Sequence, residues 1–534
     1  MSAKTFRDIL IIVIVALSVM GIYLYREWTC TNAQIGVPLD DAWIHYHFAS
    51  NLVQGNGFVY NIGEPVSGST SPFWVFLLAG VFFLSGEFLV TSKILSGFFF
   101  LCSGVGIYLF ALEQGYKRNI AMPSALITIM AGRFGWASLA GMEVTLFAFV
   151  SIVAVIKHCR DKREGRKSLV TPVLFAIASL VRPEGYALFA FATMDNMVAI
   201  TYSGSRSLML RVGSVSLIQV LIYLAIIAPY LIFSYYTTGH LLPQTYYAQN
   251  ELFGLLKRLE YLKVYVATLW DDQPLLFFFI PLGMGVFFQA AVKPATDKSP
   301  PNSLLVLLWT VGYPLLTMFV APNARHHHRY MMPLIPFYMV FAMSGITLFL
   351  RVSEDFCNRI EVDFPLWRQT ISSQYFYTLT HVLIIGISAF LTVGIWSHRF
   401  AGDVENINSQ QVAMGSWVKE HIPPEKVIAL SDIGAITYIA GRKKIIDMVG
   451  LVNPDLLAAV RSSKKDYQDV LLDFLHQRKP DYVITHPTSY PRLVAEKEVV
   501  QEIYSIELNH YSGMSAGRRM VVYKTFWNNF KEGS

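Results

Sequence analysis

Two adjacent carboxylates, Asp40 and Asp41, are the residues of this chain best suited to acid–base chemistry. They precede the stretch 42–53, in which an apolar residue recurs every four positions from Ile44 to Leu52. This spacing predicts an amphipathic helix with an apolar stripe suited to a membrane surface. A carboxylate here could take a proton from a hydroxyl or cap the helix. The two roles can coexist, one carboxylate each.

Further polar side chains stand in turns between apolar stretches. They are Glu143, Arg182, Glu184, His240, Gln244, Arg325, His328 and Arg329. Charged residues beside apolar segments are costly and usually serve function. Arginine stays charged and binds phosphate oxygens in a bidentate way, so Arg182, Arg325 and Arg329 are phosphate candidates. The structural alternative is interfacial snorkelling or, for Arg182, a salt bridge with Glu184 or Glu143.

Three consecutive histidines, 326–328, suggest a metal site at first sight. Their side chains cannot converge on one ion from a regular helix or strand, because successive side chains point in different directions. A hydrogen-bonding or phosphate-contacting role for one of them, His328, is favoured instead. A second acidic pair, Asp271-Asp272, stands just before Pro274. We expect this pair to lie in a solvated loop.

The composition is that of a membrane protein. Hydrophobic residues make up 54% of the 534 residues and charged residues only 15%, and the mean hydropathy is +0.42. A soluble globular chain has about 25% charged residues. The net charge of +6 is too small to indicate a nucleic-acid partner.

Eleven apolar runs approach the length needed to cross roughly 30 Å of hydrocarbon. They are 9–25, 92–112, 120–138, 143–157, 168–182, 185–200, 212–235, 274–292, 303–321, 330–350 and 380–397. No small-residue cleavage site follows the first run, so we expect it to be a retained anchor. A further stretch, 72–87, is expected to be a re-entrant or interfacial helix.

Lysine and arginine indicate the orientation, because they are retained on the cytoplasmic side. The loop 157–167 carries six of them, whereas the long loop 26–71 carries only Arg26. All the basic loops lie on one side if the N-terminus is inside and 72–87 does not cross. The loop 26–71, the polar groups above and the tail from about residue 400 then lie outside.

The tail, 401–534, is charged and mixed in composition. Helical patterns occupy 408–421 and 466–478, and strand-like runs occupy 426–431, 443–447, 482–485 and 520–523. Asp432 follows the first strand and either caps a helix or contacts an acceptor. The expected fold is a polytopic α-helical membrane domain, 1–400, with about eleven spans and interfacial helices, followed by an extracytoplasmic α/β domain, 401–534.

Glycosyl transfer from a lipid phosphate needs these parts. The acceptor hydroxyl attacks the anomeric carbon and loses a proton, which a carboxylate can take. The leaving phosphate needs no general acid, only positive charge or a metal ion to stabilise it.

The stretch 40–72, DDAWIHYHFASNLVQGNGFVYNIGEPVSGSTSP, resembles the first-loop signature of a group of bacterial GT-C glycosyltransferases. That group includes the mycobacterial arabinofuranosyltransferases and, more distantly, the aminoarabinose transferases of lipid A and the protein O-mannosyltransferases. Further matches follow in the expected order: SLAGMEVTLF (138–147), SLVRPEGYAL (179–188), YYTTGHLLPQTYYAQN (235–250), RHHHRYMMPLIP (325–336) and ALSDIGAITYIAGRKKIIDMVGLVNP (429–454).

The resemblance implies an inverting transferase that takes a sugar from a polyprenyl-phosphate carrier on the outer face of a bacterial inner membrane. The acceptor would be a glycan, a glycolipid or a protein. Asp40 would be the base, with Asp41 as its partner or as a ligand on the side of a metal. A divalent cation is left open, and no metal ligand set is assigned. Gln244 stands where related sequences commonly have Asn, which we expect to alter hydrogen bonding rather than reaction class.

Three rival classes remain at this stage. A polysaccharide polymerase or ligase would use a diphosphate-linked glycan and depend on the turn 325–329 more than on Asp40. A transporter would show paired halves and broken helices near the bilayer midplane, and no half-to-half similarity is present in the sequence. A non-catalytic outer receptor would not need the intramembrane arginine and glutamates.

Overall fold

The structure, a computed structural model, is mostly helical and forms two compact units. Unit 1 comprises residues 1–24, 94–227 and 252–398, and unit 2 comprises 25–93, 228–251 and 399–534. The described residues are 2–166, 168–203, 206–249, 255–292, 303–320, 322, 325–359, 374–442 and 444–530.

Unit 1 is built from helices alone in the part of it that the structure describes, with four helices running on into unit 2. Those four are α1 (Ala3–Cys30), α4 (Phe88–Glu113), α10 (Arg206–Thr238) and α21 (Gly394–Ile407). The others are α5 (Arg118–Met130), α6 (Gly132–Ala137), α7 (Val144–Glu164), α8 (Val170–Val181), α9 (Glu184–Ser203), α12 (Leu255–Asp272), α13 (Pro274–Phe277), α14 (Phe279–Ala291), α15 (Leu305–Leu307), η1 (Leu308–Gly312), α16 (Tyr313–Val320), α17 (Arg325–His328), η2 (Met332–Leu334), α18 (Ile335–Arg359), α20 (Gln374–Ser388) and η3 (Ala389–Val393).

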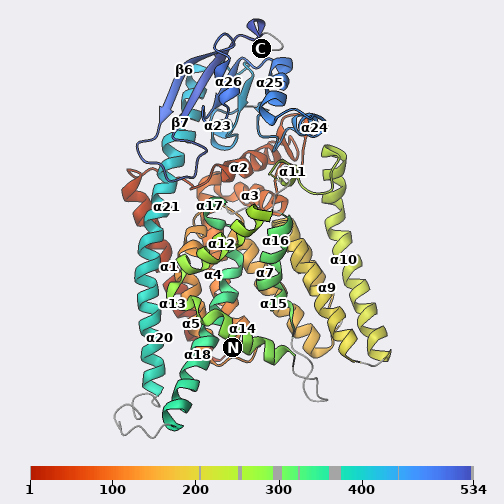
Figure 1. Ribbon diagram of the computed structural model, residues 1–534, viewed down its shortest axis with the longest axis vertical. Helices are drawn as coiled ribbons and strands as arrows, with labels where there is room; N and C mark the ends of the chain where they lie inside the picture. The colour runs from red at the N-terminus through yellow and green to blue at the C-terminus, as the bar shows by residue number, and fades with distance from the viewer. Residues whose placement is uncertain are drawn as a thin grey trace. The chain divides into compact units, whose positions relative to one another are not determined.

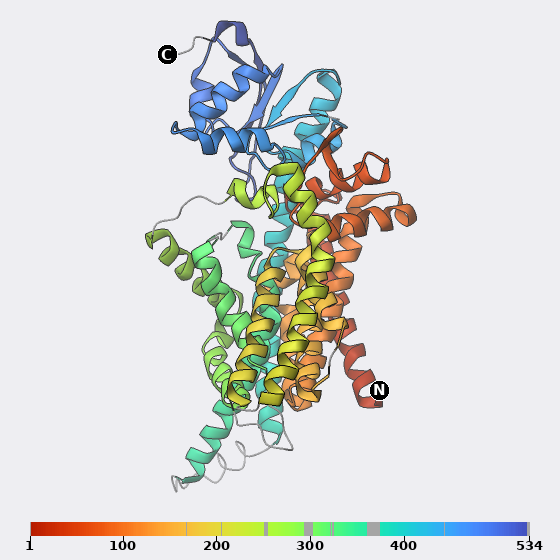
Figure 2. The same cartoon turned by 90° about the vertical axis from the view of Figure 1, so that its right-hand side faces the viewer.

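Helices α14 and α18 pack backbone against backbone through glycine. A Cβ on Gly283 would lie 1.8 Å from the carbonyl oxygen of Phe341, and one on Gly345 would lie 2.0 Å from that of Phe279. Small residues allow such close approach between membrane helices, where dispersion rather than water exclusion drives association. The orange-to-yellow helices α7, α8 and α9 run side by side in Figure 2.

Within the described ranges, six helical stretches are long and apolar enough to cross a membrane. They are Ala3–Cys30, Phe88–Glu113, Ser216–Thr238, Pro274–Ala291, His326–Phe356 and Leu379–His421, and shorter apolar helices cover Pro72–Ser85, Val170–Val181 and Leu305–Val320. The chain is therefore a helical membrane protein. The count of eleven spans and the orientation of the chain stay predictions.

The expected span 120–138 is not one helix. Helix α5 ends at Met130, Ala131 adopts an extended conformation, and α6 begins at Gly132. A Cβ on Gly132 would lie 1.9 Å from the ring of Trp396, so this break lets the chain approach an indole closely. Hydropathy alone does not reveal the break, because the stretch 120–138 is largely apolar on both sides of it and Arg133 is its single charged residue.

Unit 2 combines short helices with two sheets. Its helices are α2 (Asp40–Val53), α3 (Pro72–Ser85), α11 (Gln244–Gln249), η4 (Asn408–Val412), α22 (Ala413–His421), α23 (Gly434–Ile439), α24 (Pro454–Ser462), α25 (Tyr467–Arg478), α26 (Pro491–Ala495) and η5 (Trp527–Asn529). Its strands are β1 (Val59–Asn61), β2 (Glu64–Pro65), β3 (Ile428–Leu430), β4 (Ile446–Asp447), β5 (Tyr482–Thr485), β6 (Val500–Glu507) and β7 (Arg519–Thr525).

The larger sheet has the strand order β4-β3-β5-β7-β6. Strands β4, β3 and β5 are parallel, whereas β7 pairs antiparallel with both β5 and β6. Figure 1 shows α25 and α26 close to β6 and β7. These elements confirm every strand and helix predicted for the tail within the described residues, although residue 443 lies outside them. Strand β6 and helices α23, α24, α26 and η5 were not predicted.

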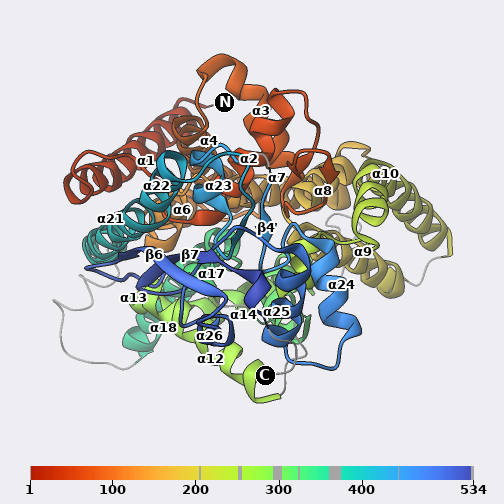
Figure 3. The same ribbon diagram turned by 90° about the horizontal axis from the view of Figure 1, so that it is seen from above.

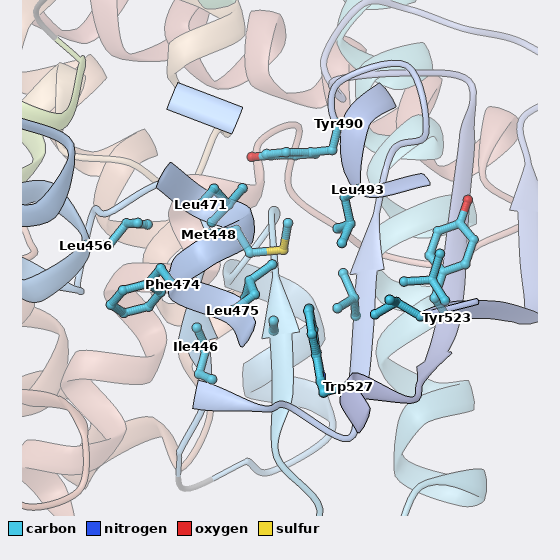
Figure 4. Close-up of a cluster of buried hydrophobic side chains, with 14 of the residues drawn as sticks. Ile446, Met448, Leu456, Leu471, Phe474, Leu475, Tyr490, Leu493, Tyr523 and Trp527 are labelled. Carbon is cyan, nitrogen blue, oxygen red and sulfur yellow. The ribbon is translucent and has the colours of Figure 1, made fainter. Parts of the chain in front are cut away.

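One apolar cluster holds the sheet and its helices together (Figure 4). Met448 and Leu475 are fully buried, and Leu471 and Leu493 pack beside the sheet with Trp527. Burying a side chain of this size contributes about 1.5–3 kcal/mol. The sheet therefore has a core of its own within unit 2.

Helix α2 confirms the helix expected after the acidic pair, but its surroundings differ from the expectation. Ile44 and Phe48 are buried as predicted for an apolar stripe, yet His45 and His47 on other faces are buried as well. Helices α3 and α23 pack against α2, and Figure 3 shows α23 beside it. The expectation of an apolar stripe resting on a membrane surface was therefore wrong.

Candidate functional site

The carboxylate of Asp40 binds two backbone amides far away in the sequence. Its Oδ2 accepts the N–H of Gly434 at 2.8 Å, and its Oδ1 accepts the N–H of Ala435 at 2.7 Å. The N-cap of its own helix is Leu39, with no side-chain cap bond. The prediction that the acidic pair caps its own helix was therefore wrong for Asp40, which instead engages the first amides of α23.

Gly434 makes this contact sterically feasible. A Cβ at this position would lie 2.1 Å from the backbone oxygen of Asp40 and 2.7 Å from its Oδ2. Both distances are far below van der Waals contact, so any larger residue must push α2 and α23 apart. The motif DIG at 432–434 thus needs its glycine for packing against the carboxylate.

Gly434→Ala is expected to lower the stability of the protein and to weaken any activity that depends on Asp40. Overpacking of this kind costs about 1–3 kcal/mol, which a thermal unfolding scan in detergent would detect. Gly402→Ala is the matched control, since no atom lies within 4 Å of its added Cβ. Equal unfolding temperatures for the two variants would contradict the close approach of Asp40 to Gly434.

Asp432 lies two residues before this contact, directly beyond β3 and Ser431. Its Oδ2 accepts the amide of Gln411 at 2.9 Å and lies 3.1 Å from Nε2 of His486. The N-cap position of α23 is Ile433, and no side chain caps it. Of the two roles expected for Asp432, helix capping was therefore wrong.

The surroundings of Asp40 raise the pKa of its carboxyl group to about 7. Burial is the largest cause, followed by the negative charge of Asp432, and Asp41 adds to the same effect. The amides of Ala435 and Gly434 act in the opposite direction, because they stabilise the carboxylate. A general base works best when its pKa lies near the working pH, so Asp40 has the proton affinity that a base at neutral pH requires.

His240 stands before α11 and Gln244 is the first residue of that helix. Both side chains contact residues in the C-terminal part of unit 2. His240 stacks on Tyr247 at 4.2 Å between ring centroids, and its Nε2 lies 3.2 Å from Nη1 of Arg461. Gln244 is buried and donates from Nε2 to the carbonyl oxygen of Gly450 at 3.2 Å. Both side chains thus hold the loop 239–249 in place.

Within unit 1, Arg182 forms a buried ion-pair cluster with both predicted glutamates. Its Nε and Nη2 donate to Oε1 of Glu184 at 2.9 and 2.7 Å, and its Nη1 donates to Oε1 of Glu143 at 2.5 Å. All three side chains are buried. Two carboxylates already offset the charge of Arg182, so its first role is to hold the ends of α7, α8 and α9 together.

Arg329 lies in the same cluster. The guanidinium carbon of Arg182 lies 5.1 Å from the centroid of the Tyr330 ring, and that of Arg329 lies 5.5 Å from the same centroid. Arg329 is buried, so a positive charge is held away from bulk water here. The side chain of Arg325, the third phosphate candidate, lies outside the described part of the structure.

The three histidines form a left-handed turn rather than a regular helix or strand. The φ angles of His326, His327 and His328 are 52°, 56° and 60°. This conformation costs roughly 1–2 kcal/mol per residue for side chains with a Cβ, and such strain concentrates at functional sites. His328 is buried, and its Nδ1 lies 3.2 Å from Oγ1 of Thr268. Its Nε2 has no hydrogen-bond partner among the described residues.

Asp272 is not in a solvated loop, contrary to the expectation. It is buried at the end of α12, and its Oδ1 accepts the backbone N–H of Arg133 at 3.0 Å. Arg133 in turn donates to the carbonyl oxygen of His327 at 3.2 Å and lies over the ring of Trp396 at 4.5 Å. Asp272 and Arg133 together thus help to hold the left-handed turn of the three histidines.

No group of three or more His, Cys, Asp or Glu side chains within the described ranges is placed to hold a metal ion. The structure brings Asp40 together with Asp432 and His486 in unit 2, and Arg182 together with Glu143, Glu184 and Arg329 in unit 1. His486 was missed in the sequence. The only signal for it is its place directly after a predicted strand.

Comparison with known proteins gives one sequence match, which covers the C-terminal region. Residues 405–523 match a family model described as a domain of unknown function (DUF8728). No curated protein matches the chain.

Solved structures match almost the whole chain. ArnT from Cupriavidus metallidurans in the apo state has a TM-score of 0.59 at 11% identity, over 99% of this chain and 99% of that one. The same protein bound to undecaprenyl phosphate has a TM-score of 0.58 at 10% identity, over 95% and 97%. The archaeal oligosaccharyltransferase AglB from Archaeoglobus fulgidus, in complex with an inhibitory peptide and a dolichol-phosphate, has a TM-score of 0.55 at 12% identity, over 100% and 76%. All of these proteins are GT-C glycosyltransferases, and the chain has the fold of the GT-C superfamily, as its motifs predict.

Proposed function

We propose that this protein is an inverting glycosyltransferase that moves a sugar from a polyprenyl-phosphate carrier to an acceptor hydroxyl. The observation that carries the proposal is the partly buried carboxyl of Asp40, held by the amides of Gly434 and Ala435, whose pKa of about 7 suits a general base. It stands in a chain with the GT-C fold. Solved structures with this fold contain undecaprenyl phosphate or dolichol-phosphate, which supports a lipid-linked donor.

In the proposed reaction, the acceptor oxygen forms a bond to the anomeric carbon while the bond from that carbon to the phosphate oxygen breaks. The acceptor proton passes to the carboxylate of Asp40, and the carrier leaves as polyprenyl phosphate. Ionised Asp40 is required, so activity should rise with pH through about 7. Asp41, adjacent to Asp40, is proposed to assist as its partner.

Positive charge would stabilise the leaving phosphate. Arg329 is buried beside Tyr330, and Nε2 of the buried His328 has no partner among the described side chains and so can donate a hydrogen bond to an oxyanion. We therefore assign phosphate contacts to Arg329 and His328, and we propose Arg325 as a third contact from the sequence alone. Arg182, Glu184 and Glu143 would shape this site through their ion pairs, and His240 and Gln244 would position the loop 239–249.

The acceptor is proposed to be a glycan, a glycolipid or a protein on the extracytoplasmic face of a bacterial inner membrane. The polar motifs and the tail would both lie on that face, opposite the basic loops. A polymerase or ligase that uses a diphosphate-linked glycan is the second candidate, because the buried guanidinium of Arg329 supplies positive charge that suits a larger anionic leaving group as well.

The test is transfer from defined donors by the purified full-length protein in liposomes. Radiolabelled sugars on polyprenyl monophosphate would be offered as a panel with cell-envelope acceptors, beside a polyprenyl-diphosphate glycan. We expect transfer from at least one monophosphate donor. Transfer from the diphosphate glycan alone would establish the ligase alternative, and transfer from neither would contradict a transferase.

A further inference from the structure

The larger sheet of unit 2 places two ionisable side chains at a point where its connections diverge. From β3 the chain continues through α23 to β4 on one side, and from the adjacent parallel strand β5 it continues through α26 to β6 on the other. In open α/β sheets, functional groups gather outside the carboxyl ends of strands at such a switch point. Asp432 follows β3 here, and His486 follows β5.

The hydrogen bonds of His486 favour its charged form. Its Nδ1 lies 3.0 Å from the carbonyl oxygen of Arg519, and its Nε2 lies 3.1 Å from Oδ2 of Asp432. Carbonyl and carboxylate oxygens accept hydrogen bonds, so both ring nitrogens face acceptors, an arrangement that favours the imidazolium form and raises the pKa of His486. His486 is fully buried, and Asp432 offsets its charge.

A short stretch of backbone connects Asp432, the partner of His486, to the carboxylate of Asp40. Two and three residues beyond Asp432, the amides of Gly434 and Ala435 donate to the two oxygens of the Asp40 carboxylate. The absence of a Cβ on Gly434 allows α2 and α23 to approach at this point. Two carboxylates and one imidazolium therefore form a single charge cluster that neither α2 nor the sheet could assemble alone.

The electrostatic interactions agree with this geometry. The charge of Asp432 raises the pKa of Asp40. Burial lowers the pKa of His486, but the contact with Asp432 raises it above its ordinary value, and the charge of Asp40 adds a smaller contribution in the same direction. Interacting groups of this kind titrate as a set. The other ionisable groups on the elements packed around Asp40 are Asp41, His45, Tyr46, His47, Tyr60 and Tyr438, since the sequence of α3 contains none. Asp41 adds a further negative charge, and burial lowers the pKa of His47 to about 4, so that it is neutral near pH 7.

We propose that Asp432 and His486 are positioning residues that fix the charge state of Asp40 and thereby set the pH range in which the protein transfers sugar. This inference rests on the proposed function, because it takes Asp40 to be the base. It gives the tail domain a role in catalysis: Asp432 keeps Asp40 able to hold a proton, and His486 limits that effect so that Asp40 can still ionise.

The test is the acid limb of the pH profile for kcat/KM. Asp432→Asn removes the neighbouring negative charge, so the midpoint should move to lower pH by roughly one unit or more. His486→Gln removes the offsetting positive charge, so the midpoint should move to higher pH. The double variant Asp432→Asn/His486→Gln leaves two neutral side chains and should return the midpoint towards that of the wild type. Asp473→Asn, which removes an exposed partner of Lys465, should leave it unchanged.

A readout independent of transfer accompanies the profile. The infrared band of a protonated carboxyl, titrated in the full-length protein and identified by its loss in Asp40→Asn, should show the same opposite shifts. Shifts in one common direction, or lower activity with no shift in any variant, would overturn the inference. If the infrared midpoints move as expected while Asp40→Asn still transfers sugar, the assignment of Asp40 as base fails and the inference about its charge state stands.

Discussion

Asp40→Asn is expected to lower kcat/KM for sugar transfer by about 10²–10⁴-fold, the usual contribution of general acid–base catalysis. The amide has nearly the shape of the carboxylate and keeps one acceptor oxygen for the amides of α23, but it cannot take up a proton. Asp473→Asn, a matched change in the same unit, should leave transfer unchanged. Initial rates with a labelled donor near pH 8, where wild-type Asp40 is ionised, give the comparison. Activity within tenfold of the wild type would contradict Asp40 as the base.

The same variant should differ from the wild type in how stability depends on pH. The pKa of Asp40 is raised from 3.8 to about 7 on folding, so the folded protein binds a proton that the unfolded chain releases between these values. The stabilisation that the proton on Asp40 provides is therefore present below about pH 4 and is lost as the pH rises through 7. The unfolding temperature of Asp40→Asn should rise relative to that of the wild type over this interval. This result would show that the loss of activity does not come from misfolding.

Arg182→Gln is expected to destabilise the protein by about 3–5 kcal/mol, because it leaves two buried carboxylates without their cation. The guanidinium donates to both Glu143 and Glu184, and all three side chains are shielded from water. Arg492→Gln is the control, since it breaks only exposed ion pairs with Asp466 and Asp469, which are worth roughly 0–1 kcal/mol each. Thermal unfolding in detergent measures the difference. A variant as stable as the control would contradict the ion-pair cluster.

A triple variant separates the structural role of Arg182 from contact with the donor. Arg182→Met combined with Glu143→Gln and Glu184→Gln removes all three charges, and neutral replacements of a buried ion cluster often restore stability. We expect its unfolding temperature to recover most of the loss. Its KM for the donor should equal the wild-type value, because Arg182 is proposed to shape the site through its ion pairs. A KM above the wild-type value would show that Arg182 also contacts the phosphate.

The sequence predicted those parts of the fold whose signals are local. The acidic pair and the apolar spacing of 42–53 predicted helix α2, and the tail showed its parallel strands as short apolar runs ending in polar residues. Strand β6 escaped notice because its residues are largely exposed or half-buried, so that it lacks an apolar run. The break at Ala131 escaped notice because hydropathy does not register backbone conformation.

The arrangement of the site depends on contacts that no local pattern contains. Asp40 binds Gly434 and Ala435, which stand 394 and 395 positions further along the chain. Its raised pKa comes from burial and from the charge of Asp432, which is equally distant in the sequence. The positive φ angles of the three histidines are equally hidden, since these residues rarely adopt such a turn. Sequence reasoning therefore identified Asp40 as a candidate but could not foresee its partners. It did foresee the salt bridge of Arg182 with Glu184 or Glu143, and the structure confirms both pairs.

The most direct test of the account is to follow the oxygen that bridges the sugar and the phosphate. A polyprenyl-phosphate sugar with ¹⁸O at that position would be converted in a single turnover by the purified protein. Attack of the acceptor at the anomeric carbon predicts that the label leaves with polyprenyl phosphate and that the product has the inverted anomeric configuration. Label retained in the glycosylated product, or a product with the donor's configuration, would contradict direct displacement with Asp40 as the base.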